Sequence, residues 1–102
     1  MRVPKKISAF GRSYDIIHDD EVTDQFDSYG LVHHGEEVVF LQKRSVKYSE
    51  QREAATLLHE IIHIIEENLR IDITEEQLGL ISTGLYGIIK ENKLCFLDIP
   101  KK

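Results

Sequence analysis

The pattern of apolar and polar residues changes near residue 49 and divides the chain into two halves. In residues 5–18 and 31–42, apolar residues come in short runs rich in β-branched and aromatic members, which favours β-strands. From residue 49 onward, apolar residues recur every three or four positions, which is the period of an amphipathic helix. Strands followed by helices predict an α+β fold.

Two hairpins account for the first half and predict a small N-terminal antiparallel β-sheet. The first hairpin turns near Gly11-Arg12, and the second turns near His34-Gly35. Five acidic residues lie between the hairpins, within residues 19–30. Their order lacks the D-x-[DN]-x-[DN]-G pattern of an EF-hand, so this segment is predicted to be a solvated turn or a short helix.

Two helices account for the second half. Residues 49–68 start with a capping serine, carry acidic residues early and continue with helix formers for 20 positions, roughly 30 Å of helix. Thr74, followed by two glutamates, opens a second helix that runs to about Asn92. Because the connection is short, the second helix is expected to fold back antiparallel to the first. Its buried face is predicted to consist of Leu78, Ile81, Leu85, Ile88 and Ile89.

Length and composition narrow the class of protein. The chain has 102 residues, which suits a single domain over residues 1–102 and is too short for two. A net charge of −5, with the thirteen Lys and Arg residues scattered, argues against nucleic acid as a partner. No apolar stretch approaches the ~20 residues that span a bilayer, so no membrane partner is expected.

The cellular setting follows from two weaker observations. The first ten residues include basic side chains without an apolar segment behind them, so no secretory signal is expected. The single cysteine, Cys95, cannot form an internal disulfide. Both observations favour a reducing, cytoplasmic setting. Cys95 is expected to be a small buried hydrophobic residue rather than a zinc ligand.

The strongest chemical signal is the stretch LLHEIIHII at residues 57–65, which contains an H-E-x-x-H motif. With five His and eleven Glu in the chain, this pattern arises by chance in roughly one such chain in forty. The motif falls on a predicted helix, where positions i and i+4 lie on the same side. His59 and His63 are therefore expected to point in one direction.

A helical wheel separates the two histidines from the core side of their helix. The apolar half contains Ala54, Ala55, Leu57, Leu58, Ile61, Ile62, Ile64 and Ile65. His59 and His63 lie in the polar half, with Glu60 at the boundary, so both imidazoles face either solvent or a cleft. A helix whose opposite face packs against the core holds its side chains rigidly, which suits a metal site. The alternative is a pair of surface histidines, with Glu60 in an ion pair on the helix surface.

Zinc chemistry explains why these residue types matter. Two imidazoles and one carboxylate leave a fourth tetrahedral position on Zn²⁺ for water. Zinc lowers the pKa of that water to about 7. His59 and His63 are the expected metal ligands, and Glu60 is the expected catalytic base that takes the proton from the water. Manganese and iron remain open as alternatives to zinc.

The third ligand is expected just beyond the motif. Glu66 and Glu67 lie on the same helix, and one straight helix cannot easily wrap three ligands around one ion. Asp72 lies in the turn and is possible. Glu75 borders the buried face of the second helix, whereas Glu76 points nearly opposite, so Glu75 is chosen and Glu76 is the second choice. Glu75 could instead serve only as a negative charge at the helix N-terminus.

Three further histidines are weaker candidates for a metal site. His33 and His34 lie at a predicted hairpin turn and are expected to be surface residues. His18, near the end of the first hairpin, has no motif around it.

Residues 56–92, TLLHEIIHIIEENLRIDITEEQLGLISTGLYGIIKEN, resemble small HExxH proteins encoded by phages and prophages of low-GC Gram-positive bacteria. These are predicted metallopeptidases of the gluzincin type, distantly similar to the ImmA/IrrE group. The similarity is firmest over residues 55–92. Family members usually have Ala-Asn where this chain has Ser82-Thr83.

The resemblance implies a minimal zincin-like domain. Zinc would lie on His59, His63 and a glutamate of the second helix, with Glu60 as general base. The resemblance also implies that the HExxH helix lies under a short sheet whose edge strand binds an extended peptide. Residues 36–41 are the candidate for that edge strand.

Three functions are compatible with the sequence. The favoured one is a zinc metallopeptidase, a hydrolase acting on a protein or peptide in the cytoplasm of a bacterial or phage-infected cell. The alternative is a catalytically silent, zinc-stabilised protein-binding module of phage or prophage origin. The third is a helical hairpin protein that binds no metal and acts only through contacts.

Overall fold

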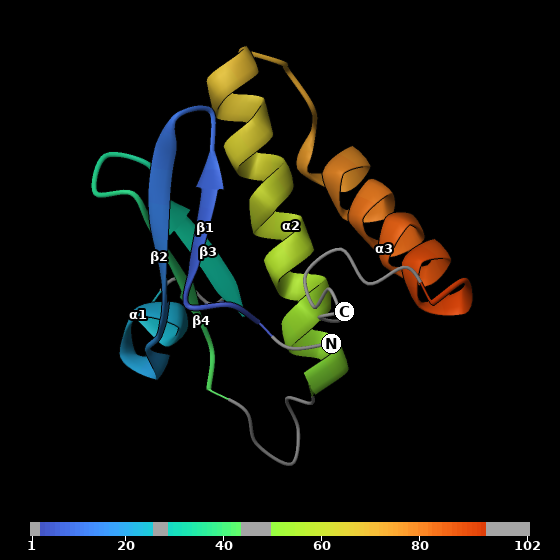
Figure 1. Ribbon diagram of the computed structural model, residues 1–102, viewed down its shortest axis with the longest axis horizontal. Helices are drawn as coiled ribbons and strands as arrows, with labels where there is room; N and C mark the ends of the chain where they lie inside the picture. Colours follow the sequence, from blue (N-terminus) through green and yellow to red (C-terminus); the bar gives the residue numbers. More distant parts are fainter. Residues whose placement is uncertain (1–2, 26–28, 44–49, 94–102) are drawn as a thin grey trace, which may run out of the picture.

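The computed structural model describes residues 3–25, 29–43 and 50–93, and shows a four-stranded sheet followed by two long helices (Figure 1). This confirms the α+β class. Helix α2 lies between the sheet and α3 (Figure 1). Cys95 lies outside the described residues. The elements are β1 (Lys6–Ala9), β2 (Arg12–His18), α1 (Asp20–Gln25), β3 (Gly30–His33), β4 (Val38–Leu41), α2 (Glu50–Leu69) and α3 (Glu75–Glu91).

The sheet has the strand order β1-β2-β4-β3. Both predicted hairpins are present and antiparallel, whereas the two inner strands, β2 and β4, pair in parallel, so the sheet is mixed. The parallel pair arises because α1 and β3 separate β2 from β4 along the chain. Residues 36–41 were expected to form the edge strand, and that prediction was wrong: β4 is paired on both sides, and the edge strands are β1 and β3.

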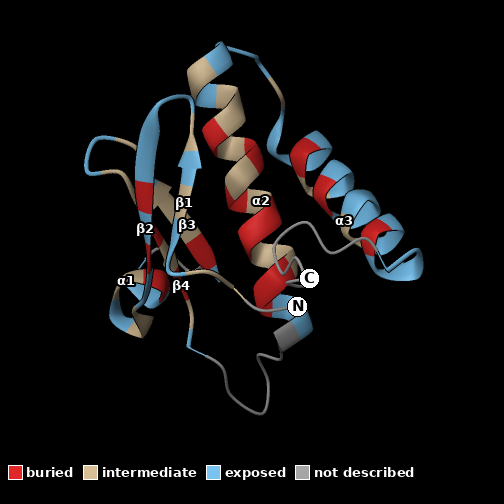
Figure 2. Cartoon of the chain, viewed as in Figure 1, coloured by how far each residue is buried: buried red, intermediate tan, exposed pale blue. Residues whose placement is uncertain are grey.

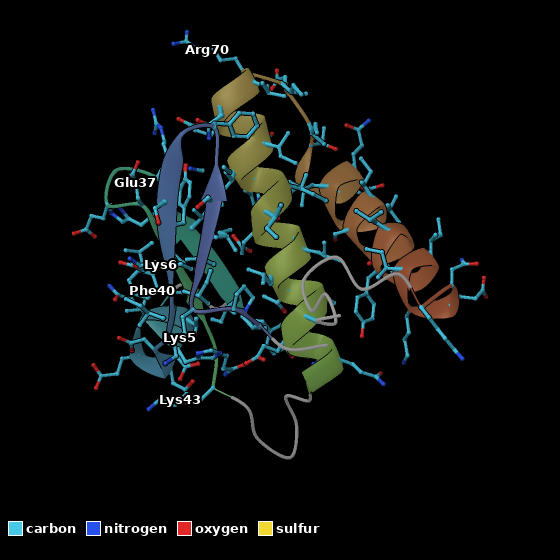
Figure 3. All side chains as sticks on the ribbon, viewed as in Figure 1. Lys5, Lys6, Glu37, Phe40, Lys43 and Arg70 are labelled. Atoms are coloured by element: carbon cyan, nitrogen blue, oxygen red, sulfur yellow. The ribbon has the colours of Figure 1, made fainter. Side chains whose placement is uncertain are left out.

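Local sequence sets the ends of the helices. Arg70 has a positive φ of 54°, and the N–H of Ile71 donates to the carbonyl of Glu66 at 3.1 Å, which closes α2 with a Schellman motif. The Arg70 side chain points away from the molecule at this turn (Figure 3). Thr74 caps α3 through a capping box with Gln77. The start of α3 is therefore fixed by side-chain hydrogen bonds.

The core lies between the inner face of the sheet and α2. Alternate residues of β2 are buried, as expected for a strand with one face on the core. The fully buried Tyr14 hydroxyl accepts a hydrogen bond from the side chain of Asn68, which satisfies its polar atom. Buried positions run along the length of α2 (Figure 2). The main cluster consists of Tyr14, Ile16, Val39, Leu41, Leu57 and Ile64.

The apolar side of α3 is less buried than the sequence predicts. Leu78 and Ile89 are buried, but Ile81, Leu85 and Ile88 are 49%, 41% and 57% exposed, so the prediction of a wholly buried face was wrong for these three. The physical reason is that α3 packs against α2 and has no comparable contact with another described element. One neighbouring helix covers only a narrow stripe of α3 (Figure 2). No described helix is long and apolar enough to span a membrane.

One buried carboxylate is paired across the core. Glu53 on α2 is 1% exposed, and its Oε2 lies 2.6 Å from Nε2 of His18 at the end of β2. The hydrogen bond joins the sheet to the first turn of α2. Replacing His18 by alanine is expected to lower the free energy of unfolding by about 1–3 kcal/mol, because the buried carboxylate loses one hydrogen bond.

Urea unfolding measures this effect, with Glu67→Ala as the control. Glu67 is exposed, and its replacement is expected to change the free energy of unfolding by less than about 0.5 kcal/mol. If His18→Ala left the unfolding midpoint unchanged, the contact with Glu53 would contribute nothing to stability.

Candidate metal centre

His59, His63 and Glu75 converge on one point between α2 and α3. Nε2 of His59 lies 2.9 Å from Oε1 of Glu75, and Nε2 of His63 lies 3.5 Å from Oε2 of the same carboxylate. The two imidazole rings meet edge to face, with centroids 5.1 Å apart. The spacing of one helical turn on α2 and the position of Glu75 as the first residue of α3 produce this arrangement.

The distances suit ligands around one small cation. Two ligand atoms at about 2.1 Å from a tetrahedral zinc ion lie roughly 3.4 Å apart. The separations of 2.9 and 3.5 Å between the Glu75 oxygens and the two Nε2 atoms bracket that value. The donor set of two imidazole nitrogens and a carboxylate oxygen is also the one that zinc accepts. Residues with these donors could therefore hold a metal ion.

The other nitrogen of each imidazole has its own partner. The Ser82 hydroxyl donates to the carbonyl of Gly79 at 3.0 Å, so its oxygen can accept from Nδ1–H of His59, 3.4 Å away. The carboxylate of Glu66 only accepts, and it lies 3.2 Å from Nδ1 of His63. Both contacts favour a proton on Nδ1. They leave the Nε2 atoms facing Glu75, where a metal ion could bind between the two nitrogens and the carboxylate; without an ion, a proton on Nε2 would fill the same position.

Glu60 is the most buried charged group of the centre. It is 4% exposed, on the side of α2 that faces β3. Burial raises the pKa of the Glu60 carboxyl to about 7; the charge of His63 lowers it, that of Glu75 raises it, and a hydrogen bond from the backbone of Val32 lowers it. The carboxyl can therefore exchange a proton near neutral pH.

The described residues contain a His/Glu group that could hold a metal ion. Potential ligand atoms of His59, Glu60 and His63 lie within 4.8 Å of one another; Glu75 is not in this group and joins the two histidines through its contacts with their Nε2 atoms. In the described part of the chain, neither Asp72 nor Glu76 forms a hydrogen bond or ion pair with either histidine. The identity of the metal is not fixed by these contacts.

Two cavities open on either side of the centre, along strand β3. One, of about 260 Å³, extends toward Tyr29 and Arg52; the other, of about 290 Å³, extends toward His34. Gly30, His59 and Glu60 line both cavities, and the two together are called the β3 groove below. Gly30 lets β3 lie close to α2, because a Cβ there would lie 2.6 Å from Cγ2 of Thr56.

Glu66 connects two parts of the centre. Its Oε1 contacts Nδ1 of His63, and its Oε2 accepts from the backbone N–H of Ile73 at 3.1 Å, two residues before Glu75. Replacing Glu66 by alanine is expected to weaken zinc binding about 10- to 100-fold, because His63 and the segment leading to Glu75 both lose their support. Competition against a chromophoric chelator measures the affinity.

Glu67→Ala is the matched control for this prediction. Glu67 is the next residue on α2 and is exposed. Zinc affinity within about twofold of the parent chain is expected for Glu67→Ala. The same result for Glu66→Ala would mean that the carboxylate does not support the ligands.

Sequence reasoning placed several functional positions differently. Glu66 was considered as a ligand and set aside, and the structure places it behind His63 instead. Ser82 was noted only as a position where the chain departs from the family it resembles, and His34 was expected at the surface. The sequence signal for both Glu66 and Ser82 was helical spacing. Glu66 lies three residues after His63, and Ser82 lies seven residues after Glu75, so each falls on the same side of its helix as a proposed ligand. No sequence signal pointed to His34, because its approach to the centre depends on how β3 packs on α2.

No protein-family model, no curated protein and no solved structure matches this chain. The resemblance noted in the sequence therefore remains an expectation. What can be concluded about function rests on the side chains that α2, α3 and β3 bring together.

Proposed function

We propose that the protein is a zinc-dependent metallopeptidase. One observation carries the proposal: the Nε2 atoms of His59 and His63 lie against the same Glu75 carboxylate, with Glu60 buried beside them. Two imidazoles and one carboxylate are the protein ligands of catalytic zinc sites that keep a position open for water or substrate. In this proposal the three residues hold the zinc ion.

In the proposed reaction, the zinc ion and Glu60 have separate roles. A bound zinc ion supplies Lewis acidity, which acidifies a water molecule to a pKa of about 7 and polarises the carbonyl group of the substrate. Glu60 takes the proton from the attacking water and delivers it to the nitrogen of the departing amine. Glu60 is buried beside the proposed ligands and faces β3, which places its carboxyl within reach of both transfers.

The proposed substrate is an extended peptide in the β3 groove. β3 is an edge strand, and an extended peptide can add to such an edge through main-chain hydrogen bonds. The groove passes Glu60 and His59, which would bring a peptide bond to the centre. A domain of this size builds few walls around the groove, which favours a narrow target. Cleavage within the cytoplasm of a bacterial or phage-infected cell is part of the proposal.

A second function is favoured by the exposed side of α3. Ile81, Leu85 and Ile88 present apolar surface among the described residues, as expected at a site of protein contact. A catalytically silent, zinc-stabilised binding module would use that surface and would need His59 and His63, but not Glu60.

A peptide library distinguishes these functions. Zinc-loaded protein is incubated with the library, with and without chelator, and the products are identified by mass spectrometry. We expect cleavage at defined positions that stops with the chelator and returns with zinc. Zinc-loaded protein that cleaves neither peptides nor unfolded proteins would contradict the peptidase and favour the binding module.

A further inference from the structure

His34 lies in the wall of the β3 groove, immediately beyond the end of β3. It lines the cavity of about 290 Å³ together with His59, Glu60, His63 and Glu75. The Glu75 carboxylate contacts Nε2 of both His59 and His63, whereas the His34 ring forms no hydrogen bond or ion pair with either of them in the described part of the chain. His34 is therefore placed beside the metal position rather than on it.

The two histidines of this hairpin turn differ in what they bind. Nδ1 of His33 accepts from the backbone N–H of Glu36 at 3.2 Å and lies 3.6 Å from its carboxylate, so this exposed ring closes the turn. His34 contributes only its main chain to the turn, through its carbonyl and the N–H of Glu37. The turn therefore does not need the His34 ring.

The His34 ring contains a buried polar atom that the fold does not satisfy. Nδ1 of His34 is buried and has no hydrogen-bond partner among the described residues, and it is the only such side-chain atom there. Buried polar atoms without partners are rare, and each calls for an explanation. A buried ring nitrogen without a proton costs less when it lacks a partner than a buried N–H does. The neutral imidazole of His34 therefore favours the tautomer with its proton on Nε2.

His34 is also the remaining donor on this wall. The rings of His59 and His63 use Nε2 toward the metal position and Nδ1 toward Ser82 and Glu66. The other lining side chains are apolar or are the carboxyl groups of Glu60, the proposed base, and Glu75, a proposed ligand. Among the described lining side chains, His34 alone has an uncommitted N–H to offer a substrate.

We propose that His34 is a catalytic residue that donates a hydrogen bond to the carbonyl oxygen of the peptide bond during attack. This rests on the proposed peptidase function. As the oxygen of water bonds to the carbonyl carbon, the π electron pair moves onto the carbonyl oxygen, and the imidazole N–H stabilises the developing charge. When that pair returns, the C–N bond breaks and the amine leaves with the proton from Glu60. His34 keeps its own proton throughout.

The test compares three variants on a peptide that the wild-type protein cleaves. His34→Ala is expected to lower kcat by roughly 10²–10³-fold with KM within about twofold, since the hydrogen bond forms mainly in the transition state. His34→Gln keeps an N–H donor and is expected to recover part of the rate. Glu67→Ala, at an exposed position of α2 outside the β3 groove, is the control and is expected to cleave at the wild-type rate. Zinc content should equal wild type in all three.

A binding measurement separates this role from a structural one. A phosphinic peptide mimics the tetrahedral, charged oxygen, and its affinity is expected to fall in His34→Ala by about the same factor as kcat. Affinity for the intact peptide is measured in the Glu60→Gln background, where the peptide is not cleaved. The Kd of Glu60→Gln and the Kd of the double variant Glu60→Gln/His34→Ala are expected to agree within about twofold. Unchanged kcat, or zinc loss in His34→Ala, would overturn the role of His34 and leave the peptidase intact. Wild-type protein that neither cleaves peptide nor binds the phosphinate would overturn both.

Discussion

Replacing Glu60 by glutamine is expected to reduce peptide hydrolysis by roughly 10²–10⁴-fold while leaving about one zinc ion per chain. Glutamine has nearly the same shape but cannot accept the proton of the attacking water. The ligand atoms of His59, His63 and Glu75 are untouched. Initial rates on a cleaved peptide, together with elemental analysis of the same preparation, measure both effects.

Glu76→Gln is the control for charge removal near the centre. Glu76 is the neighbour of a proposed ligand, is exposed, and forms no ion pair with either histidine among the described residues. Its replacement should leave both the rate and the zinc content unchanged. A Glu60→Gln variant that retained the parent rate would assign proton transfer to another group and remove the main chemical argument for the peptidase.

Replacing His63 by alanine is expected to remove zinc and to destabilise the fold. The variant keeps only two of three proposed ligands, so untagged protein purified without added metal should contain far less zinc than wild type. Metal that binds only the native state stabilises it by about 2.7 kcal/mol at a hundredfold excess over Kd. For a domain of this size, that corresponds to a fall in Tm of about 10 °C or more on chelation.

The comparison with chelator provides the internal check. Chelator should lower the Tm of wild type and leave the Tm of His63→Ala nearly unchanged, since the variant has little metal to lose. Wild-type protein without zinc, even after incubation with the ion, would exclude both zinc functions. The histidines of the motif would then be polar residues on one face of α2.

Local interactions made the helices predictable from the sequence. The second helix was expected to open at Thr74, and the capping box with Gln77 places its first residue at Glu75. The helix that carries the motif was expected over residues 49–68 and is found at Glu50–Leu69. Hydrogen bonds within a few residues fix these boundaries, so the information lies in neighbouring positions.

Non-local pairing explains what the sequence did not reveal. The parallel contact of β2 with β4 joins segments about 23 residues apart, and nothing within either strand specifies the direction. The edge position of β3 follows from that contact, which is why residues 36–41 were assigned to the edge incorrectly. Burial on α3 depends on how many neighbours the helix has. An apolar stripe shows which side is hydrophobic, not what covers it.

For the candidate site, the spacing of residues along the sequence predicts which proposed ligands lie close together, but it does not predict which groups surround them. The helical repeat relates His59 to His63, and a short connection brings Glu75 toward them. Ser82 and His34 approach from α3 and from the end of β3, and their positions depend on packing between elements. Contacts of this kind, between elements distant in the sequence, are not predictable from local residue patterns.

The attachment of α3 to α2 also has a kinetic consequence. Glu75 is the only proposed ligand outside α2, and α3 has no comparable contact with another described element. Segments with few buried contacts open locally at a lower free-energy cost than the core. If α3 swings away, the ion keeps only the two imidazoles. We therefore expect the rate at which zinc exchanges with solution to follow the opening of one helix, well before the sheet and α2 unfold.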